Sequence, residues 1–307
     1  MDIIILLFGF SIGLVLLVKG ADEMVSSAIQ IALKFKLPSS IVGATFIGFG
    51  TSAPELFAST RAALKGDLDL GIGNIVGSNI ANSLLVVAVL YLALPKDYSK
   101  KINLNKISPT WMAILTTIFV STYLLTNKFP FLLGVALLVL VLYVIYKMIS
   151  SESDDEEGLI EEEKSYIWLR GGMSLVATLY GSQLVVENAV EIASIFGVSS
   201  LVIGSTIIAI GTSLPEVAGT ISAAKMRKPD IVFGNIFGSN LFNIGLVGGA
   251  AIMISPGEIS SAIDYQLFIM YFVSFVVIFL SRNTIKRNEI LGYVFIALYV
   301  LFLISLF

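Results

Sequence analysis

Two glutamates, Glu55 and Glu216, lie in two copies of one short motif within apolar sequence. The copies are Gly50-Thr-Ser-Ala-Pro-Glu55 and Gly211-Thr-Ser-Leu-Pro-Glu216. We expect the first glycine of each copy to break its helix within the membrane. In each copy the proline has no N–H, so the carbonyl of this glycine, four residues earlier, loses its helical partner. A serine precedes each glutamate at the spacing of a capping box. Each copy therefore gathers freed carbonyls, hydroxyls and a carboxylate, which is the oxygen set that hard cations such as Ca²⁺ and Na⁺ prefer.

A second polar motif, Gly-Asn-Ile-X-Gly-Ser-Asn-X-X-Asn, follows each glutamate and begins at Gly73 and Gly234. We interpret its glycines as sites of close helix packing. Asn74 and Asn235 extend the polar stripe of each copy. The serine and the last asparagine are four residues apart and share a helical face, so their neutral oxygens are suited to complete a cation shell; these residues are Ser78, Asn82, Ser239 and Asn243.

Both motifs recur at one offset, which indicates an internal duplication. The offset is 161 residues between Glu55 and Glu216 (216 − 55) and again between Ser78 and Ser239 (239 − 78). Two motifs at one spacing are the signature of a repeated unit. We therefore divide the chain into a first repeat at 1–149, an acidic linker at 150–165 and a second repeat at 166–307.

The composition is typical of an integral membrane protein. The chain has 307 residues, of which 56% are hydrophobic and 13% charged, whereas soluble domains carry about 25% charged residues. There is no cysteine and no histidine, so disulfides, thiolate metal sites and histidine-based catalysis are excluded. No acid–base pair is evident beyond the two glutamates, and we expect neither an enzyme nor a bound cofactor.

The apolar runs predict an all-α fold of about ten transmembrane helices, five in each repeat. The predicted spans are 3–33, 39–64, 71–94, 109–126, 129–149, 166–194, 199–225, 231–254, 264–282 and 287–306. An odd number of spans per repeat makes the second copy enter the membrane from the opposite side. The prediction is thus two inverted five-helix repeats with broken helices at the centre, a recurring transporter design with its site at the midplane.

The glutamates have a simpler interpretation, in which each only caps a half-helix. Two intramembrane copies, brought together by an inverted repeat, argue against it, because buried carboxylates are costly in lipid and usually functional. The acidic stretch at 154–163 we interpret as a solvated linker. For Lys19, Asp22 and Glu23 we expect pairing with one another.

The distribution of basic residues predicts the orientation. If the N-terminus is outside, the cytoplasmic segments hold 15 of the 19 lysines and arginines, one lies within the first span, and three are external. This asymmetry agrees with the positive-inside rule. We expect a multi-pass protein of the cell membrane with both termini outside and the 150–165 loop cytoplasmic. The external three are Arg61, Lys65 and Lys128.

Together, the paired motifs resemble the two α-repeats of the sodium/calcium exchanger family, within the cation/calcium antiporter superfamily. The resemblance implies antiport by alternating access, with about three Na⁺ exchanged for one Ca²⁺ and a net charge moved in each cycle. It implies a Ca²⁺ site between Glu55 and Glu216, assisted by the carbonyls of Thr51 and Thr212. The flanking Na⁺ sites that it implies use Ser52, Ser78, Ser213, Ser239 and the carbonyls of Gly48 and Ala209.

Two positions bear on the transported ions. The proton/calcium branch usually has a glutamate where this chain has Gly77 and Gly238, which favours Na⁺ here. Known sodium/calcium members have an aspartate where this chain has Asn243. Two ionised glutamates neutralise one Ca²⁺, whereas three Na⁺ leave a net charge of +1. An aspartate at 243 would have to stay neutral to give this balance, so we hypothesise that asparagine fixes the neutral state.

Other functions remain open at this point. A proton/calcium or other cation antiporter of the same fold predicts transport that survives without Na⁺. A cation channel is disfavoured by the pseudo-symmetry, the midplane site and the lack of an obvious subunit ring. We expect Ca²⁺, Na⁺ and the bilayer as the partners, with no nucleic acid, and a monomer that suffices for function.

Overall fold

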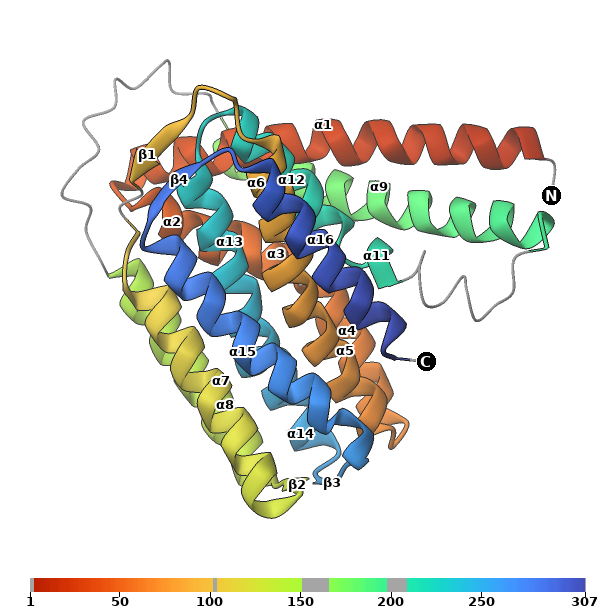
Figure 1. Ribbon diagram of the computed structural model, residues 1–307, viewed down its shortest axis with the longest axis vertical. Helices are drawn as coiled ribbons and strands as arrows, with labels where there is room; N and C mark the ends of the chain where they lie inside the picture. The colour runs from red at the N-terminus through yellow and green to blue at the C-terminus, as the bar shows by residue number, and fades with distance from the viewer. Residues whose placement is uncertain (1–2, 102–103, 151–165, 198–208, 307) are drawn as a thin grey trace.

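The computed structural model describes residues 3–101, 104–150, 166–197 and 209–306, and is almost entirely helical (Figure 1). The acidic linker falls outside the described residues. The first half contains α1 (Ile3–Phe35), α2 (Ser39–Val42), α3 (Phe49–Thr51), α4 (Ala53–Leu64), α5 (Leu68–Ala81), α6 (Val87–Ala93), α7 (Ile107–Thr126) and α8 (Phe131–Ile149). The second contains α9 (Ile167–Ile195), α11 (Ala209–Gly211), α12 (Leu214–Lys225), α13 (Pro229–Phe242), α14 (Gly249–Ile254), α15 (Asp264–Ser281) and α16 (Glu289–Ile304).

The duplication is visible in the helix bounds. Helices α4 and α12 begin and end exactly 161 residues apart, and so do α5 and α13. Two π-helical segments, Asn82–Val86 and Asn243–Gly248, follow α5 and α13 at the same offset. A third, Gly43–Gly48, joins α2 to α3. The predicted fold of repeated five-helix units with broken central helices is confirmed.

Two short antiparallel strand pairs hold the halves together. Strand β1 (Ser99–Lys101) pairs with β4 (Thr284–Lys286), and β2 (Lys128–Phe129) pairs with β3 (Gly257–Glu258). Each pair takes one strand from each half. In the ten-span order the members of each pair fall on the same side of the membrane, which is the arrangement that inverted repeats require.

Helices α1 and α9 form a long antiparallel pair, in which the N-terminal part of α1 and the C-terminal part of α9 project beyond the remaining helices (Figure 1). Small residues allow the close approach: a Cβ added to Gly181 would lie 2.4 Å from the backbone nitrogen of Leu17. Glycines of this kind are typical of transmembrane helix interfaces. Glu23, expected to pair within the cluster of Lys19, Asp22 and Glu23, instead pairs with Arg170 of α9, with 3.3 Å between the charged atoms.

Six described helices are long and apolar enough to cross a membrane, or seven if the bent pair Ser39–Thr51 and Ala53–Leu64 is one span. This number is lower than the ten predicted spans, for physical reasons. Helix α16 is apolar but has 16 residues, and α9 carries charged residues along its length. The predicted span at 199–225 lies partly outside the described residues.

Candidate functional site

The two motif glutamates are buried at the starts of equivalent helices. Glu55 and Glu216 each occupy the third position of their helix, α4 or α12, and are only 3% and 2% exposed. Helix N-termini carry unpaired N–H groups and a partial positive charge, which stabilises nearby carboxylates. Glu216 is near enough to Glu55 for the charge of one to act on the other, and the hydroxyl of Thr51 lies near the Glu216 carboxyl group. The fold therefore brings the two copies of the motif together.

The helix break lies two residues later than expected. It falls at Ser52, where ψ is 0°, and at Ser213, where ψ is 4°, and the first break bends the span by 45°. The glycines were expected to break the helices, but Gly50 and Gly211 both have helical assignments. The proline inside the first turn of the next helix removes a backbone donor, so the chain must turn just before it.

Two expectations about this break require correction. The predicted capping-box bond is absent, since neither serine side chain caps its helix. The hydroxyl of Ser52 instead has no hydrogen-bond partner. The carbonyl of Gly211, expected to be free, accepts a hydrogen bond from Ser182 of α9 at 3.1 Å.

Hydroxyl groups from both halves surround the glutamates. Ser78 donates to Oε1 of Glu55 at 3.3 Å. Across the interface between the halves, the hydroxyls of Ser239 and Thr51 lie 3.5 Å apart. Ser239 also donates to the carbonyl of Gly48 at 3.3 Å. The structure thus brings together predicted site residues from α3, α4, α5 and α13.

The asparagines form a network that crosses between the halves. The amide of Asn82 donates to Oδ1 of Asn240 at 3.1 Å, and the amide of Asn243 donates to Oδ1 of Asn79 at 3.0 Å. Reasoning from the sequence assigned no role to Asn79 and Asn240, although both end the Gly-Ser-Asn motif. Asn82 and Asn243 each open a π-helical segment, a feature common at functional sites.

Asn74 and Asn235, the first asparagines of the two Gly-Asn-Ile motifs, lie in different environments. Asn74 donates to the hydroxyl of Ser59 at 2.9 Å, whereas Asn235 accepts from Ser239 at 3.3 Å. Ser213 is 1% exposed, and Thr212 lines a cavity beside it. Ala209, the remaining predicted residue, is the first residue of α11 and adjoins a stretch outside the described residues.

Four buried oxygens at this centre have no hydrogen-bond partner. Most buried polar atoms in proteins are paired, so a group of unpaired acceptors needs an explanation. Among the described residues no three acidic side chains cluster, so this centre offers two carboxylates and neutral oxygens. That combination fits a hard cation. The four oxygens are Ser52 Oγ, Glu55 Oε2, Glu216 Oε2 and Asn243 Oδ1.

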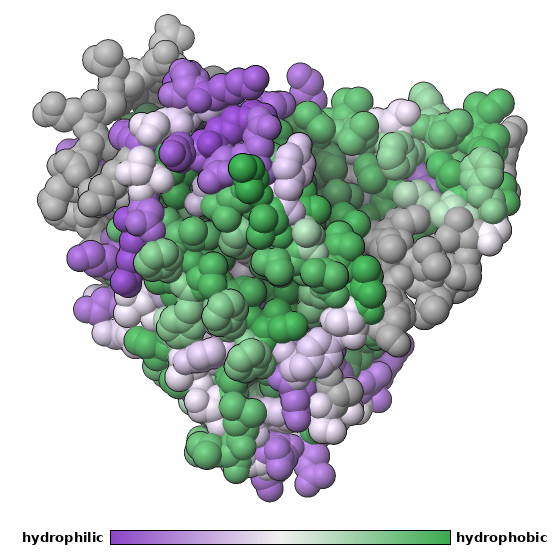
Figure 2. All heavy atoms as spheres, viewed as in Figure 1, coloured by the Kyte–Doolittle hydropathy of each residue, from purple (hydrophilic) through white to green (hydrophobic). Residues whose placement is uncertain are grey.

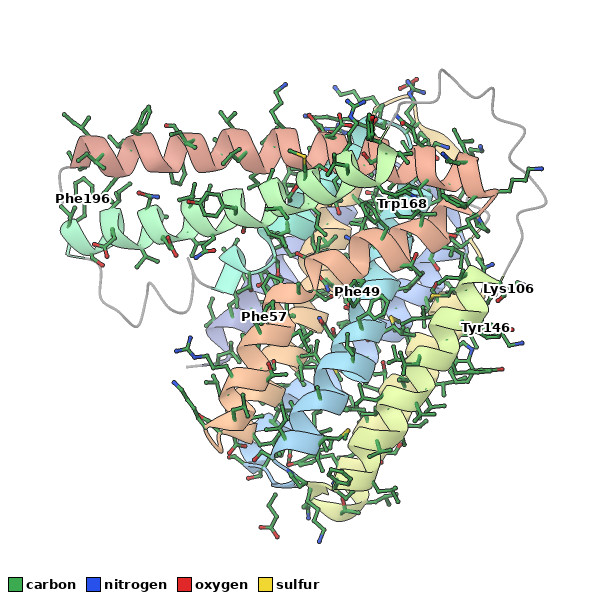
Figure 3. All side chains as sticks on the ribbon, turned by 180° about the vertical axis from the view of Figure 1, so that it is seen from behind. Phe49, Phe57, Lys106, Tyr146, Trp168 and Phe196 are labelled. Atoms are coloured by element: carbon green, nitrogen blue, oxygen red, sulfur yellow. The ribbon has the colours of Figure 1, made fainter. Side chains whose placement is uncertain are left out.

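A cavity of about 170 Å³ reaches the centre between α5, α15 and α16. Its lining residues include Ser78, Ser213, Gln266 and Phe302. Figure 3 shows α4 and α5 from behind, with Phe49 labelled at the broken helix and Phe57 further along α4. We interpret the cavity as the path that connects the candidate ligands to solvent.

This path is testable because the chain has no cysteine. We expect Gly73→Cys, which places the thiol on the cavity wall, to react with a membrane-impermeant maleimide on one side of sealed vesicles. The neighbouring Ile72 is fully buried, so Ile72→Cys should stay unlabelled and is the matched control. Equal labelling of both variants would show that the cavity is not the path.

Comparisons with known proteins agree with this geometry. A family model described as sodium/calcium exchanger protein matches residues 5–151 and 166–307. The chain is 30% identical to the sodium/calcium exchanger MaX1 of Methanosarcina acetivorans, over 96% of this chain and 97% of that protein. It is 31% identical to the inner membrane protein YrbG of Escherichia coli (strain K12), over 89% and 88%. A structure of the sodium-calcium exchanger NCX_Mj matches with a TM-score of 0.83 at 28% identity, over 100% of both chains.

Proposed function

Because the chain belongs to the sodium/calcium exchanger family, we propose that it exchanges Na⁺ for Ca²⁺ across the cell membrane, with about three Na⁺ for each Ca²⁺. The proposal rests on Glu55 and Glu216, which are both buried, each have an oxygen without a hydrogen-bond partner, and are near enough for the charge of Glu55 to act on Glu216. In a membrane interior such carboxylates are costly unless they bind ions. The family is one of transporters, so the site serves transport rather than catalysis.

In this proposal Ca²⁺ binds between Glu55 and Glu216. The carbonyls of Thr51 and Thr212 complete its shell, and the unpaired carboxylate oxygens supply its charge. The Na⁺ ions occupy flanking sites built from neutral oxygens, and the short distances from Ser78 to Glu55 and from Ser239 to Gly48 support them. These sites use Ser52, Ser78, Asn82, Ser213, Ser239, Asn243 and the carbonyls of Gly48 and Ala209.

The two ions compete for the same two carboxylates, which couples their movements. A carrier with both glutamates empty of cations would hold two uncompensated charges in a low-dielectric interior, and this state is unfavourable. The protein therefore changes its access side when loaded with Ca²⁺ or with Na⁺. The crossed asparagine pairs, Asn82 with Asn240 and Asn243 with Asn79, lie between the halves and hold them in register during that change.

The orientation is part of the proposal. The end of the molecule that carries β1 and β4 also carries Lys96, Arg227 and Arg287. The positive-inside rule makes this end cytoplasmic and puts both termini outside. In this orientation the cavity beside α5 opens to the outside, since it lies toward the end of α16.

Uptake of radioactive Ca²⁺ into proteoliposomes tests the proposal. We expect vesicles loaded with Na⁺ to accumulate Ca²⁺ only when an outward Na⁺ gradient is present. Uptake that ignores Na⁺ but follows a proton gradient would instead assign a proton/calcium antiporter. Absence of Ca²⁺ flux under both gradients would show that the family fold here serves another cation.

The proposed stoichiometry predicts a response to voltage. Three Na⁺ leaving a vesicle for each Ca²⁺ that enters carry one net positive charge outward, so an inside-positive potential should drive Ca²⁺ uptake. One charge in 100 mV corresponds to about 2.3 kcal/mol, which raises the equilibrium Ca²⁺ accumulation about 50-fold. The measurement is uptake at potentials set by K⁺ and valinomycin. Accumulation that does not change with potential would mean an electroneutral two-for-one exchange.

A further inference from the structure

A second cavity, which shares no lining residue with the cavity beside the glutamates, lies between α7 and α15. It is a groove of about 410 Å³, which is larger than the cavity beside the glutamates. Its walls are Pro109, Ala113 and Ile114 of α7 and Phe275 and Phe279 of α15. Phe279 is 68% exposed, so the groove opens outward, toward the acyl chains of the bilayer.

One charged residue, Arg282, closes the groove at its end. It follows the last residue of α15, while Pro109 lies in the first turn of α7. The charged end of the groove is therefore at the depth where a spanning helix emerges from hydrocarbon. A side chain here meets lipid headgroups, and the apolar part of the groove meets the acyl chains.

Arg282 differs from the other arginines at this end of the molecule. Arg170, Arg227 and Arg287 each pair with a carboxylate, at 3.3 Å, 2.6 Å and 2.9 Å respectively. Within the described ranges Arg282 has no carboxylate within salt-bridge distance. A guanidinium in this setting presents its fork of N–H donors to an outside anion, and phosphate matches that fork.

The surroundings of Arg282 favour an anionic partner. Lys106 precedes α7, and the paired strands β1 and β4 carry Lys100 and Lys286. Figure 2 shows hydrophilic residues gathered at the β1/β4 end, above the apolar face formed by α15 and α16. The nearby acid Glu289 is already paired with Arg287. Basic pockets between helices at this membrane level are a recognised way to bind anionic headgroups.

We propose that the groove between α7 and α15 is a binding site for one anionic phospholipid, whose phosphate pairs with Arg282 and whose acyl chain lies against Ala113, Phe275 and Phe279. The site requires both parts, since the apolar walls bind any chain and the arginine selects the charge. The inference does not rest on the proposed exchange activity, because binding is measurable without transport.

The test is native mass spectrometry of the purified full chain with phosphatidylglycerol or phosphatidylcholine of identical acyl chains. We expect one retained phosphatidylglycerol, bound about fivefold more tightly than phosphatidylcholine. Arg282→Gln should remove this preference and Arg282→Lys should keep part of it. The matched control is Arg61→Gln, which removes an exposed charge in the last turn of α4, on the opposite side of the membrane in the proposed orientation, and should leave the preference intact.

Two further experiments distinguish the contribution of the acyl chain to binding from that of the headgroup. Ala113→Phe fills the groove without changing charge and should weaken binding of both lipids. Glycerol 3-phosphate, which lacks acyl chains, should not displace the lipid. Thermal unfolding in detergent alone checks that each variant is folded. The proposal is overturned if Arg282→Gln keeps the full preference in a folded protein, if both lipids bind wild type equally, or if glycerol 3-phosphate competes.

Discussion

We expect Ca²⁺ uptake to fall at least about 100-fold in both Glu55→Gln and Glu216→Gln, since each change leaves one carboxylate to balance a divalent ion. Breaking a buried charge set by removing one partner costs about 3–5 kcal/mol, which corresponds to a loss of binding of 100-fold or more. Glutamine keeps the shape and one acceptor oxygen, so the loss reports on charge. The measurement is Na⁺-driven uptake of radioactive Ca²⁺ into proteoliposomes.

The control for this result is Glu187→Gln. Glu187 lies on α9, where its carboxylate accepts a hydrogen bond from Gln183 at 2.8 Å on an exposed face. This change removes the same charge from the chain and should leave uptake within about twofold of wild type. Full activity in either motif variant would contradict a shared carboxylate site. Loss of activity in Glu187→Gln would show that net charge, rather than the central pair, controls transport.

The repeat explains why so much of the fold was predictable from sequence. Helices α4 and α12 have the same offset as the motifs that begin them, because the same proline and serine act on the backbone in each copy. Local chemistry of this kind depends on a few neighbouring residues. The pairing of β1 with β4 also agrees with the predicted alternation of spans.

The remaining features depend on contacts that no local pattern encodes. Ser182 donates a hydrogen bond to the carbonyl of Gly211 only because α9 packs beside α11. Asn79 and Asn243 are 164 residues apart in the sequence. They meet because α5 lies beside the π-helical segment Asn243–Gly248. The repeated Gly-Ser-Asn ending was the available signal for Asn79. It did not say whether that residue faces an ion, lipid or another asparagine.

We expect Gly238→Ala to destabilise the protein by about 1–3 kcal/mol, the range typical of inserting a methyl group into a tightly packed interior. A Cβ at this position would lie 2.4 Å from the carbonyl oxygen of Ala44 and 2.5 Å from its Cα. Both are backbone atoms, so a side-chain rotation cannot relieve the overlap. Helix α13 must instead move away from the π-helical segment Gly43–Gly48, which also supplies the carbonyl of Gly48 to Ser239. We therefore expect a lower unfolding temperature together with weaker Na⁺ dependence of uptake.

Gly248→Ala is the matched control, because Gly248 is also buried in a helical segment of the second half. Its added Cβ would meet its nearest neighbour at 3.4 Å, an ordinary contact. Replacing a helical glycine with alanine then stabilises by about 0.5–1 kcal/mol through backbone entropy. Thermal unfolding in detergent should thus separate the two variants in opposite directions from wild type. If both alanines lower stability equally, helix flexibility matters more than close packing. If neither alanine lowers stability, α13 can move away from the segment Gly43–Gly48 at no cost. The contact of Gly238 with Ala44 then does not hold Ser239 in the candidate site.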